Sequence, residues 1–206
     1  MVDKLLLATN NQGKVREYRS LLKNIPLQLV TMAEEGINTV VDEVGESLEE
    51  NAGLKARLLA AESHLMALAD DSGLEVDVLG GEPGILTARY AGEEASDRDR
   101  VEYLLSRLID VLWEKRSARF RCVIAVATPG GEVELCSGEC PGFITFEPKG
   151  EYGFGYDPVF YLPELGKTMA ELTPEIKNQV SHRGQAAGKV SRLLEKILAD
   201  LQKQNN

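Results

Sequence analysis

Apolar residues recur along this chain with two periods, one typical of β-strands and one typical of helices. Short apolar runs predict strands at residues 4–9, 28–32, 120–127, 133–137 and 159–162. Apolar residues three and four positions apart predict helices at residues 15–22, 47–63, 96–113 and 185–202. A Pro-Gly-Gly turn at residues 129–131 joins two of the strands as a hairpin. Strands that alternate with helices, together with one hairpin, predict an α/β fold with a mixed sheet.

Polar residues at the predicted helix starts support these boundaries. Ser47 and Glu50 form a capping box before one helix, and Ser96 with Asp99 opens the next. Ser181 is placed to cap the last helix. In the helix at 96–113 we expect the apolar positions to be buried, namely Val101, Leu104, Leu105, Leu108 and Leu112.

Ala69-Asp70-Asp71-Ser72-Gly73 is the most unusual stretch of the chain. Apolar residues 65–68 lead into it and residues 74–79 alternate after it, which predicts a strand, a tight turn and a second strand. Adjacent carboxylates at a buried strand end repel each other unless a divalent cation or a shared proton neutralises one. The alternative is a surface turn in which Asp70 caps the backbone and Asp71 faces water. The stretch alone leaves both open.

A polar segment, Thr9-Asn10-Asn11-Gln12-Gly13-Lys14, connects the first predicted strand to the first helix. Free backbone N–H groups and the positive end of the helix dipole favour an anion at such a position. The segment is not a Walker A loop, because Ala8 and Val15 replace its first Gly and its Ser or Thr. It is either a phosphate-binding loop, which Lys14 favours, or a simple Asn-rich connection.

Further polar and aromatic positions have two interpretations each. Glu43, after Asp42, either shares a metal with Asp71 or lies in a solvated loop, and Lys55 is by default a solvated helix lysine. Gly153-Phe154-Gly155-Tyr156-Asp157-Pro158 either accepts a flat ligand or forms an aromatic core turn. The segment from Lys177 to Arg183 gathers hydrogen-bond donors, which suit an anion or a carbonyl acceptor.

Composition narrows the class of protein. The 206 residues carry a formal net charge of −10, which disfavours binding to nucleic acid and to anionic membranes. No apolar run is long enough to span a bilayer, and Met1-Val2-Asp3-Lys4 leads directly into a predicted strand without a signal peptide. Three cysteines suit neither a disulfide framework nor a zinc site. We expect a soluble, cytoplasmic protein.

These motifs together resemble the inosine triphosphate pyrophosphatase family, the dITP/XTP diphosphatases. The resemblance runs almost end to end, and its specificity lies in the joint order and spacing of the motifs. They are residues 9–14, Glu50-Asn51-Ala52 with Lys55, residues 69–74, Pro83-Gly84 with Ala88-Arg89-Tyr90, residues 153–158, Ala170-Glu171-Leu172 and Ser181-His182-Arg183. Thr87 stands where the family often has Ser, and we expect little consequence.

The resemblance implies a fold, a reaction and a site. The fold is an elongated mixed sheet flanked by helices, a single domain over residues 1–206 with two lobes and a central nucleotide cleft, usually a homodimer. The reaction is Mg²⁺-dependent hydrolysis of ITP, dITP and XTP to the monophosphate and pyrophosphate. Asp71 is then the catalytic carboxylate and, with Glu43, a metal ligand, while Asp70 is a supporting charge. Triphosphate-binding residues would be Thr9, Asn10, Asn11, Gln12, Gly13, Lys14, Lys55 and Ser72, and base-binding residues Phe154, Gly155, Tyr156 and Asp157. Lys177, His182 and Arg183 would complete base and phosphate recognition.

Three other functions compete with this one. A Maf-like nucleotide pyrophosphatase would catalyse a related reaction on other bases, but the Ser-His-Arg and Phe-Gly-Tyr-Asp segments argue against it. A nucleotide-binding protein without turnover would keep the pocket but has no need for a costly pair of carboxylates. Nucleic-acid binding is the weakest alternative, because no basic stripe with interleaved aromatic residues is present.

Overall fold

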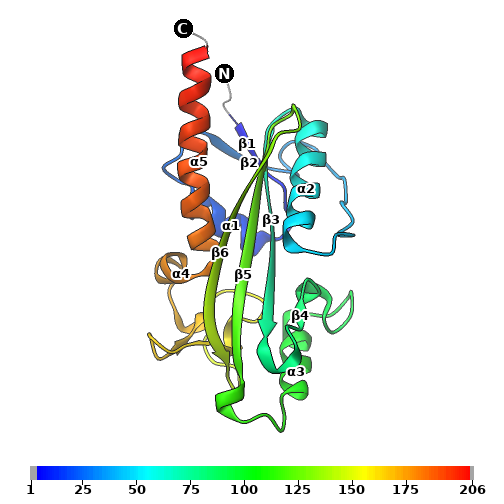
Figure 1. Cartoon of the computed structure of the whole chain (residues 1–206), viewed down its shortest axis with the longest axis vertical. Helices are drawn as coiled ribbons and strands as arrows, with labels where there is room; N and C mark the ends of the chain where they lie inside the picture. The colour runs from blue at the N-terminus through cyan, green and yellow to red at the C-terminus, as the bar shows by residue number, and fades with distance from the viewer. Residues whose placement is uncertain (1–3, 205–206) are drawn as a thin grey trace. The chain divides into compact units, whose positions relative to one another are not determined.

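The computed structural model describes residues 4–204, and it contains the strands and helices of an α/β protein (Figure 1). The strands are β1 (Lys4–Leu7), β2 (Gln28–Thr31), β3 (Met66–Val76), β4 (Pro83–Gly84), β5 (Ser117–Ala127), β6 (Val133–Ile144), β7 (Phe160–Leu162) and β8 (Lys167–Thr168). The helices are α1 (Gln12–Leu21), α2 (Leu48–Ser63), α3 (Asp97–Arg107), α4 (Pro174–Val180) and α5 (His182–Gln204). Residues 1–3, which bear on the expected absence of a signal peptide, lie outside the described residues.

The strands form one mixed sheet, as predicted. Its eight strands run in the order β2-β1-β3-β5-β6-β7-β8, with β4 paired to β3. Strand β1 lies parallel to both β2 and β3, whereas β4, β7 and β8 join the sheet in antiparallel pairs. The chain divides into two compact units: unit 1 comprises residues 1–71, 122–138 and 183–206, and unit 2 comprises residues 72–121 and 139–182. The single two-lobed domain and its cleft stay predictions.

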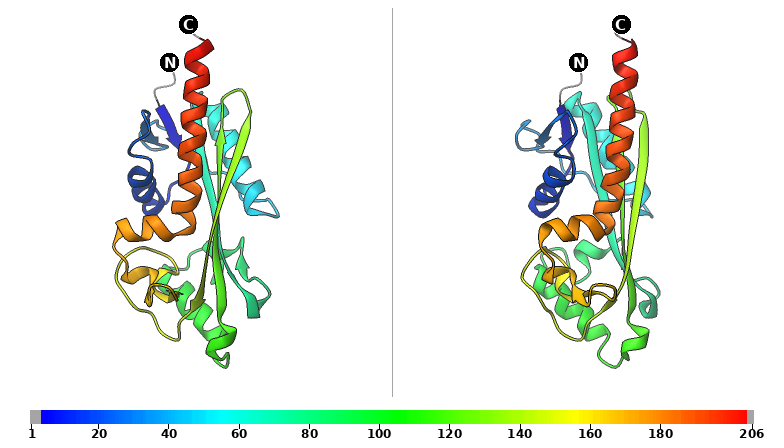
Figure 2. Two further views of the ribbon diagram at one scale, coloured as in Figure 1. Left: turned by 60° about the vertical axis from the view of Figure 1, so that its left-hand side comes forward. Right: turned by 90° about the vertical axis from the view of Figure 1, so that its left-hand side faces the viewer.

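Helices cover both faces of the sheet in unit 1. Helices α2 and α5 lie on opposite sides of β3 and β5, and the turned views of Figure 2 agree with this arrangement. Leu5 of β1 and Leu68 of β3 share one core with Tyr18 of α1 and Val190 of α5. Because a strand sends successive side chains to opposite faces, residues 66, 68 and 70 of β3 face α1 and α5. Residues 67, 69 and 71 therefore face α2.

The strand, turn and strand predicted around residues 69–73 are wrong. Strand β3 runs without interruption through all five residues. Gly73 does not serve a turn: a Cβ there would lie 2.6 Å from the carbonyl oxygen of Gly84, so glycine permits β4 to approach β3. Thr87 also fixes this approach, since its hydroxyl accepts from the Leu74 N–H at 2.8 Å and donates to the Gly84 carbonyl at 2.6 Å.

Several helix ends also differ from the predictions. Helix α1 begins at Gln12, because Asn11 caps it, and α5 begins at His182, directly after Ser181. Each helix starts three residues earlier than expected. Helix α3 ends at Arg107, six residues early, and Leu112 is 66% exposed where burial was expected. Helix α4 was not predicted, since its 7 residues are too few to display a period.

The capping predictions are confirmed in part. Ser96 and Asp99 form a complete capping box at the start of α3. At α2 the Ser47 side chain accepts from the Glu50 N–H, but the Glu50 carboxylate accepts from the Glu46 N–H instead of closing the box. Glu50 therefore ties the preceding loop to α2.

Candidate functional site

Asp70 and Asp71 are adjacent in sequence but point to opposite faces of β3. Asp70 is buried on the face that α1 and α5 cover, and Asp71 is buried on the face of α2. The two carboxylates therefore have different ion-pair partners, although Lys55 also acts on Asp70 and Lys14 on Asp71 through the electrostatic field. The two residues lie in two neighbouring polar networks.

The Asp71 network lies within unit 1 and contains three residues that the sequence analysis singled out. Lys55 of α2 places its ammonium 2.6 Å from Oε1 of Glu43, 2.9 Å from the Asp70 carbonyl oxygen and 3.9 Å from Oδ1 of Asp71. Oδ2 of Asp71 accepts a hydrogen bond of 3.1 Å from Nδ2 of Asn51. Lys55 is thus no solvated helix lysine, and Glu43 is no solvated loop residue.

The charges of this network shift the pKa values of both partners. Burial raises the pKa of the Asp71 carboxyl, and the Glu43 carboxylate raises it further, although Lys55 and Asn51 act in the opposite direction. Burial alone would lower the pKa of Lys55, but Asp71 and Glu43 outweigh it and raise that pKa. A carboxylate with a raised pKa is a better proton acceptor, which suits Asp71 to general-base chemistry.

The Asp70 network holds the Lys14 and Arg183 side chains. Oδ1 of Asp70 lies 3.0 Å from the Lys14 ammonium, and Oδ2 lies 3.2 Å from the Arg183 guanidinium. Arg183 also pairs with Glu17 of α1 at 2.8 Å. Despite burial, Lys14 and Arg183 hold the pKa of Asp70 well below its usual range. Asp70 is therefore an ionised, structural anion, and it fixes the direction of Lys14 at the first turn of α1.

The predicted phosphate segment consists of a short connection, residues 9–11, and the start of α1. Asn11 caps α1 by accepting from the Lys14 N–H at 3.1 Å, and the Thr9 hydroxyl accepts from the Asn11 N–H at 3.2 Å. Gln12, Gly13 and Lys14 lie in the first turn of α1, not in a loop as predicted. The α1 N-terminus thus presents its dipole next to a lysine.

Unit 2 contains the aromatic part of the predicted site. The Lys177 ammonium of α4 forms a buried ion pair with Asp157 and lies 4.8 Å from the centroid of the Phe154 ring. Oδ2 of Asp157 also accepts from the Phe154 N–H at 2.8 Å. Gly153 has φ +80°, and a Cβ there would lie 2.0 Å from Oδ2 of Asp157, so only glycine fits.

The remaining predicted residues of unit 2 are fixed by different partners. The Gly155 N–H donates to Asp97 of α3 at 2.7 Å, and the buried Tyr156 donates its hydroxyl to the Thr87 carbonyl at 3.1 Å. His182 is buried and stacks on the Phe120 ring, with centroids 4.6 Å apart. Ser72, the first residue of this unit, is half-buried. These contacts fix the segment that carries Phe154, and the Phe154 side chain is partly exposed.

The structure therefore assembles two groups of predicted residues, one in each unit. Unit 1 brings Glu43, Lys55 and Asp71 together, and it joins Lys14 to Arg183 through Asp70. Unit 2 brings Phe154, Asp157 and Lys177 together. Sequence reasoning did not assign roles to Asn51, Glu17, Asp97 or Phe120. Asn51 carried a signal, because it is a polar residue on the apolar stripe of α2 that also contains Leu48, Ala52 and Leu59.

Comparison with known sequences decides the family. The sequence model of the Ham1 family matches residues 5–193. The chain belongs to the Ham1 family. Ham1-family relatives include the "dITP/XTP pyrophosphatase" of Bacillus subtilis, 47% identical over 190 residues that cover 92% of this chain and 96% of the relative. The protein of the same name from Escherichia coli K12 is 49% identical over 187 residues, covering 90% of this chain and 94% of the relative.

Solved structures of Ham1 proteins share the fold. A Ham1 protein from Coxiella burnetii superposes with a TM-score of 0.85 at 39% identity, covering 94% of this chain and 99% of the other. The Ham1 protein of Staphylococcus aureus gives a TM-score of 0.83 at 41% identity, with the same coverage of both chains. These similarities confirm the fold class and the family resemblance.

The donor set of this Ham1 protein fits a hard divalent cation. The described residues contain no group of three or more His, Cys, Asp or Glu side chains that could hold a metal by themselves. Mg²⁺ does not need one, because it is usually bound by one or two carboxylates together with waters and substrate phosphates. Asp71 and Glu43 flank the same Lys55 ammonium, and each raises the cost of charging the other, which a cation would relieve.

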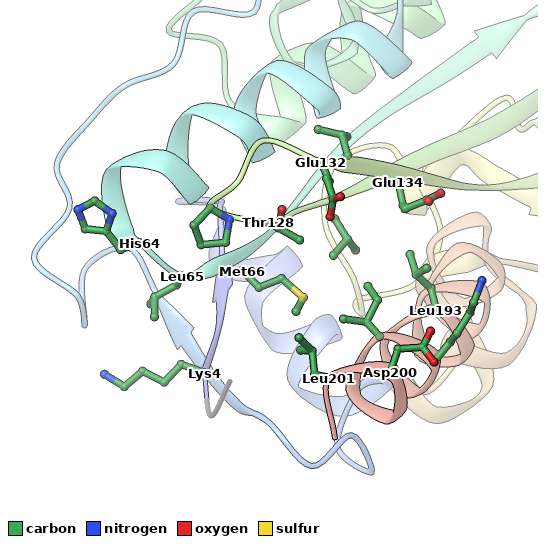
Figure 3. A pocket seen from close by; sticks show the side chains of 15 residues that line it. Lys4, His64, Leu65, Met66, Thr128, Glu132, Glu134, Leu193, Asp200 and Leu201 are labelled. Atoms are coloured by element: carbon green, nitrogen blue, oxygen red, sulfur yellow. The ribbon is translucent and has the colours of Figure 1, made fainter. Parts of the chain in front are cut away.

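A hollow of unit 1 contains none of the predicted site residues. This cavity of about 820 Å³ lies beside β1, the β5–β6 hairpin and α5 (Figure 3). Met66, Leu193 and Leu201 contribute to its apolar lining, and Glu132 and Asp200 to its polar lining.

Among the residues that the structure describes, no helix has the length and apolar character that crossing a membrane requires.

Proposed function

We propose that this Ham1-family protein is a nucleoside triphosphate pyrophosphatase that hydrolyses ITP, dITP and XTP to the monophosphate and pyrophosphate. The observation that carries the proposal is the Glu43–Lys55–Asp71 arrangement, in which a buried carboxylate with a raised pKa lies beside a lysine and a second carboxylate. The relatives named "dITP/XTP pyrophosphatase" support the substrate class. Such an enzyme removes deaminated purine nucleotides from the nucleotide pool.

Asp71 and Glu43 would hold Mg²⁺, and Asp71 would also act on the attacking water. When bound, the metal neutralises triphosphate charge and polarises the bond that breaks. Asp71 would orient the water toward the α-phosphorus and accept its proton. Lys55 stabilises the negative charge that moves onto the pyrophosphate leaving group.

The α1 N-terminus would bind the remaining phosphate charge. Residues 9–13 contribute side chains and backbone N–H groups at the positive end of the helix dipole, and Ser72 adds a hydroxyl. Lys14 supplies a cation whose direction Asp70 already fixes, so little side-chain entropy is lost on binding. This preorganisation would favour the charged triphosphate over a nucleoside.

Unit 2 would select the base. Phe154 offers a half-exposed ring on which a purine stacks, while Gly155, Tyr156 and Asp157 line the edge of the base. Donors from His182 and the backbone, with Lys177 holding Asp157, would face the 6-carbonyl of hypoxanthine or xanthine. Arg183, a residue of unit 1, is the further donor that the resemblance assigns to base and phosphate recognition. Adenine presents an amino donor at that position, so a donor faces a donor and the pair is left unsatisfied.

The deciding experiment is product analysis with Mg²⁺ and equal concentrations of ITP, XTP, GTP, ATP and TTP. We expect monophosphate and pyrophosphate from ITP and XTP, with little product from the others. Rapid hydrolysis of TTP or UTP would favour the Maf-like alternative instead. Release of orthophosphate and a diphosphate would contradict attack at the α-phosphorus, and binding without turnover would favour the non-hydrolysing alternative.

His182→Ala tests the base selection. Loss of one buried donor costs about 1–3 kcal/mol, so the preference for ITP over ATP in kcat/KM should fall by about ten- to a hundredfold. The ratio is measured on one preparation, so any loss of folded protein cancels between the two substrates. An unchanged ratio would remove His182 from base recognition.

The resemblance adds two further elements to this proposal, a homodimer and a cytoplasmic location. Neither takes part in the chemistry assigned to Glu43, Lys55 and Asp71, all of which lie in one unit of a single chain.

A further inference from the structure

Asn51 is a fully buried polar side chain in the middle of the proposed catalytic network. Its exposed fraction is 0%, and it occupies the apolar stripe of α2 where the neighbouring positions are leucine and alanine. Burying an amide is costly unless its donors and acceptors are paired. Both ends of this amide are paired, and each end has a different kind of partner.

The two partners fix the orientation of the Asn51 amide. Nδ2 donates to Oδ2 of Asp71 at 3.1 Å, and Oδ1 accepts from the Gly45 N–H at 2.8 Å. A carboxylate can only accept and a backbone N–H can only donate, so rotating the amide by 180° would break both bonds. The side chain therefore has one favourable orientation.

Gly45 brings the loop that carries Glu43 against this amide. A Cβ at position 45 would lie 2.7 Å from Oδ1 of Asn51 and 2.8 Å from the Cβ of Glu50. Such contacts are closer than Cβ atoms tolerate, so glycine is required for the backbone to approach. Glu43 is only two residues away and directs its carboxylate to Lys55 at 2.6 Å.

We propose that Asn51 is a positioning residue that holds both carboxylates of the proposed metal site at once. It fixes Asp71 directly through Nδ2, and it fixes Glu43 through the Gly45 backbone and Oδ1. Asn51 donates to Oδ2 of Asp71, and Oδ1 of the same carboxylate lies 3.9 Å from the Lys55 ammonium. The expected fall in kcat rests on the whole of the proposed function. The expected fall in metal affinity rests only on the proposed metal site.

Asn51→Leu is the main test, because leucine has nearly the same size and lacks both hydrogen-bonding groups. Partners that orient metal ligands typically contribute 10–100-fold to metal affinity or activity. We expect the Kd of Mn²⁺, measured by electron paramagnetic resonance without nucleotide, to rise at least about tenfold. We expect kcat for ITP to fall by a similar factor while KM changes less than about threefold.

Two more variants separate positioning from folding. Asn51→Ala serves if the leucine variant does not fold, and Leu59→Ala is the matched control because Leu59 is buried two turns further along α2. Leu59→Ala should lose stability but keep the Mn²⁺ affinity of the wild type. Gly45→Ala should also raise the Kd of Mn²⁺, because a Cβ at position 45 would disturb the hydrogen bond from the Gly45 N–H to Oδ1 of Asn51.

The proposal fails if Asn51→Leu and Asn51→Ala agree with the wild type within twofold in both Mn²⁺ affinity and kcat. It also fails if Leu59→Ala, at the same loss of stability, loses as much Mn²⁺ affinity. A wild type whose Mn²⁺ affinity depends on Asn51 but that does not hydrolyse ITP would refute the proposed function and leave this inference standing.

Discussion

We expect Asp71→Asn to lower kcat for ITP by about 10²–10⁴-fold while the chain stays folded. The variant keeps the size of the side chain, and its amide oxygen can still accept from Nδ2 of Asn51, so the α2 contact survives. What disappears is the negative charge that would hold the metal and the basic oxygen that would take a proton from water. Both losses act on the chemical step.

Single-turnover kinetics with ITP, with circular dichroism to check folding, measures this loss. Asp110→Asn is a suitable control, because Asp110 is an exposed carboxylate of unit 2. It should leave kcat within twofold of the wild type. Near-normal turnover of Asp71→Asn would exclude Asp71 from the mechanism, whatever its pKa.

We expect Arg183→Met to lower the free energy of unfolding by about 3 kcal/mol, the lower end of the usual cost of breaking a buried ion pair. Asp70 would stay buried and ionised with Lys14 as its remaining cation, which limits the loss. Glu17 would lose its partner as well. Urea unfolding of the variant and the wild type measures the difference.

The acid limb of stability provides an independent test of the same pair. Because the pKa of Asp70 is lowered on folding, its ionised form stabilises the protein above the ordinary aspartate value near 3.9. That contribution declines as the pH falls below this value. Asp71, with its raised pKa, contributes with the opposite sign. Asp70→Asn should therefore show a smaller loss of stability between about pH 5 and pH 2 than the wild type.

The double variant Asp70→Asn, Arg183→Met completes this test. It should be more stable than Arg183→Met alone, since the Asp70 carboxylate is no longer buried without Arg183, even though Glu17 still lacks its partner. An Arg183→Met protein within 1 kcal/mol of the wild type, or an unchanged acid limb in Asp70→Asn, would show that Asp70 is not held by these cations.

Local patterns predicted most elements correctly, and their failures share a cause. Strands such as β1 and β2, and the helix α2 with its Ser47 cap, follow from period and capping. Residues 69–73 were misassigned because Asp, Ser and Gly are typical of turns. Pairing within the sheet and the cations on each face outweigh that preference in β3.

The candidate site was likewise predictable from the sequence only in part. Residue types identified Glu43, Lys55 and Asp71 as chemically significant, and the structure brings all three together. It was not predictable that Lys55 lies between the two carboxylates, or that Lys14 pairs with Asp70. These contacts join residues from different elements, whose distances depend on how the elements pack.

The sequence by itself determined the fold class, the family and the polar residues on which the chemistry depends, because periodicity and motif order are properties of the chain. Only the tertiary structure decided that Asp70 and Asp71 point to opposite faces of one strand and have different ion-pair partners. It also decided that Asn51, a helix residue of no obvious role, joins Asp71 to the Glu43 loop. The physical reason is that hydrogen bonds and ion pairs act over a few ångströms, and packing alone brings these residues within that range.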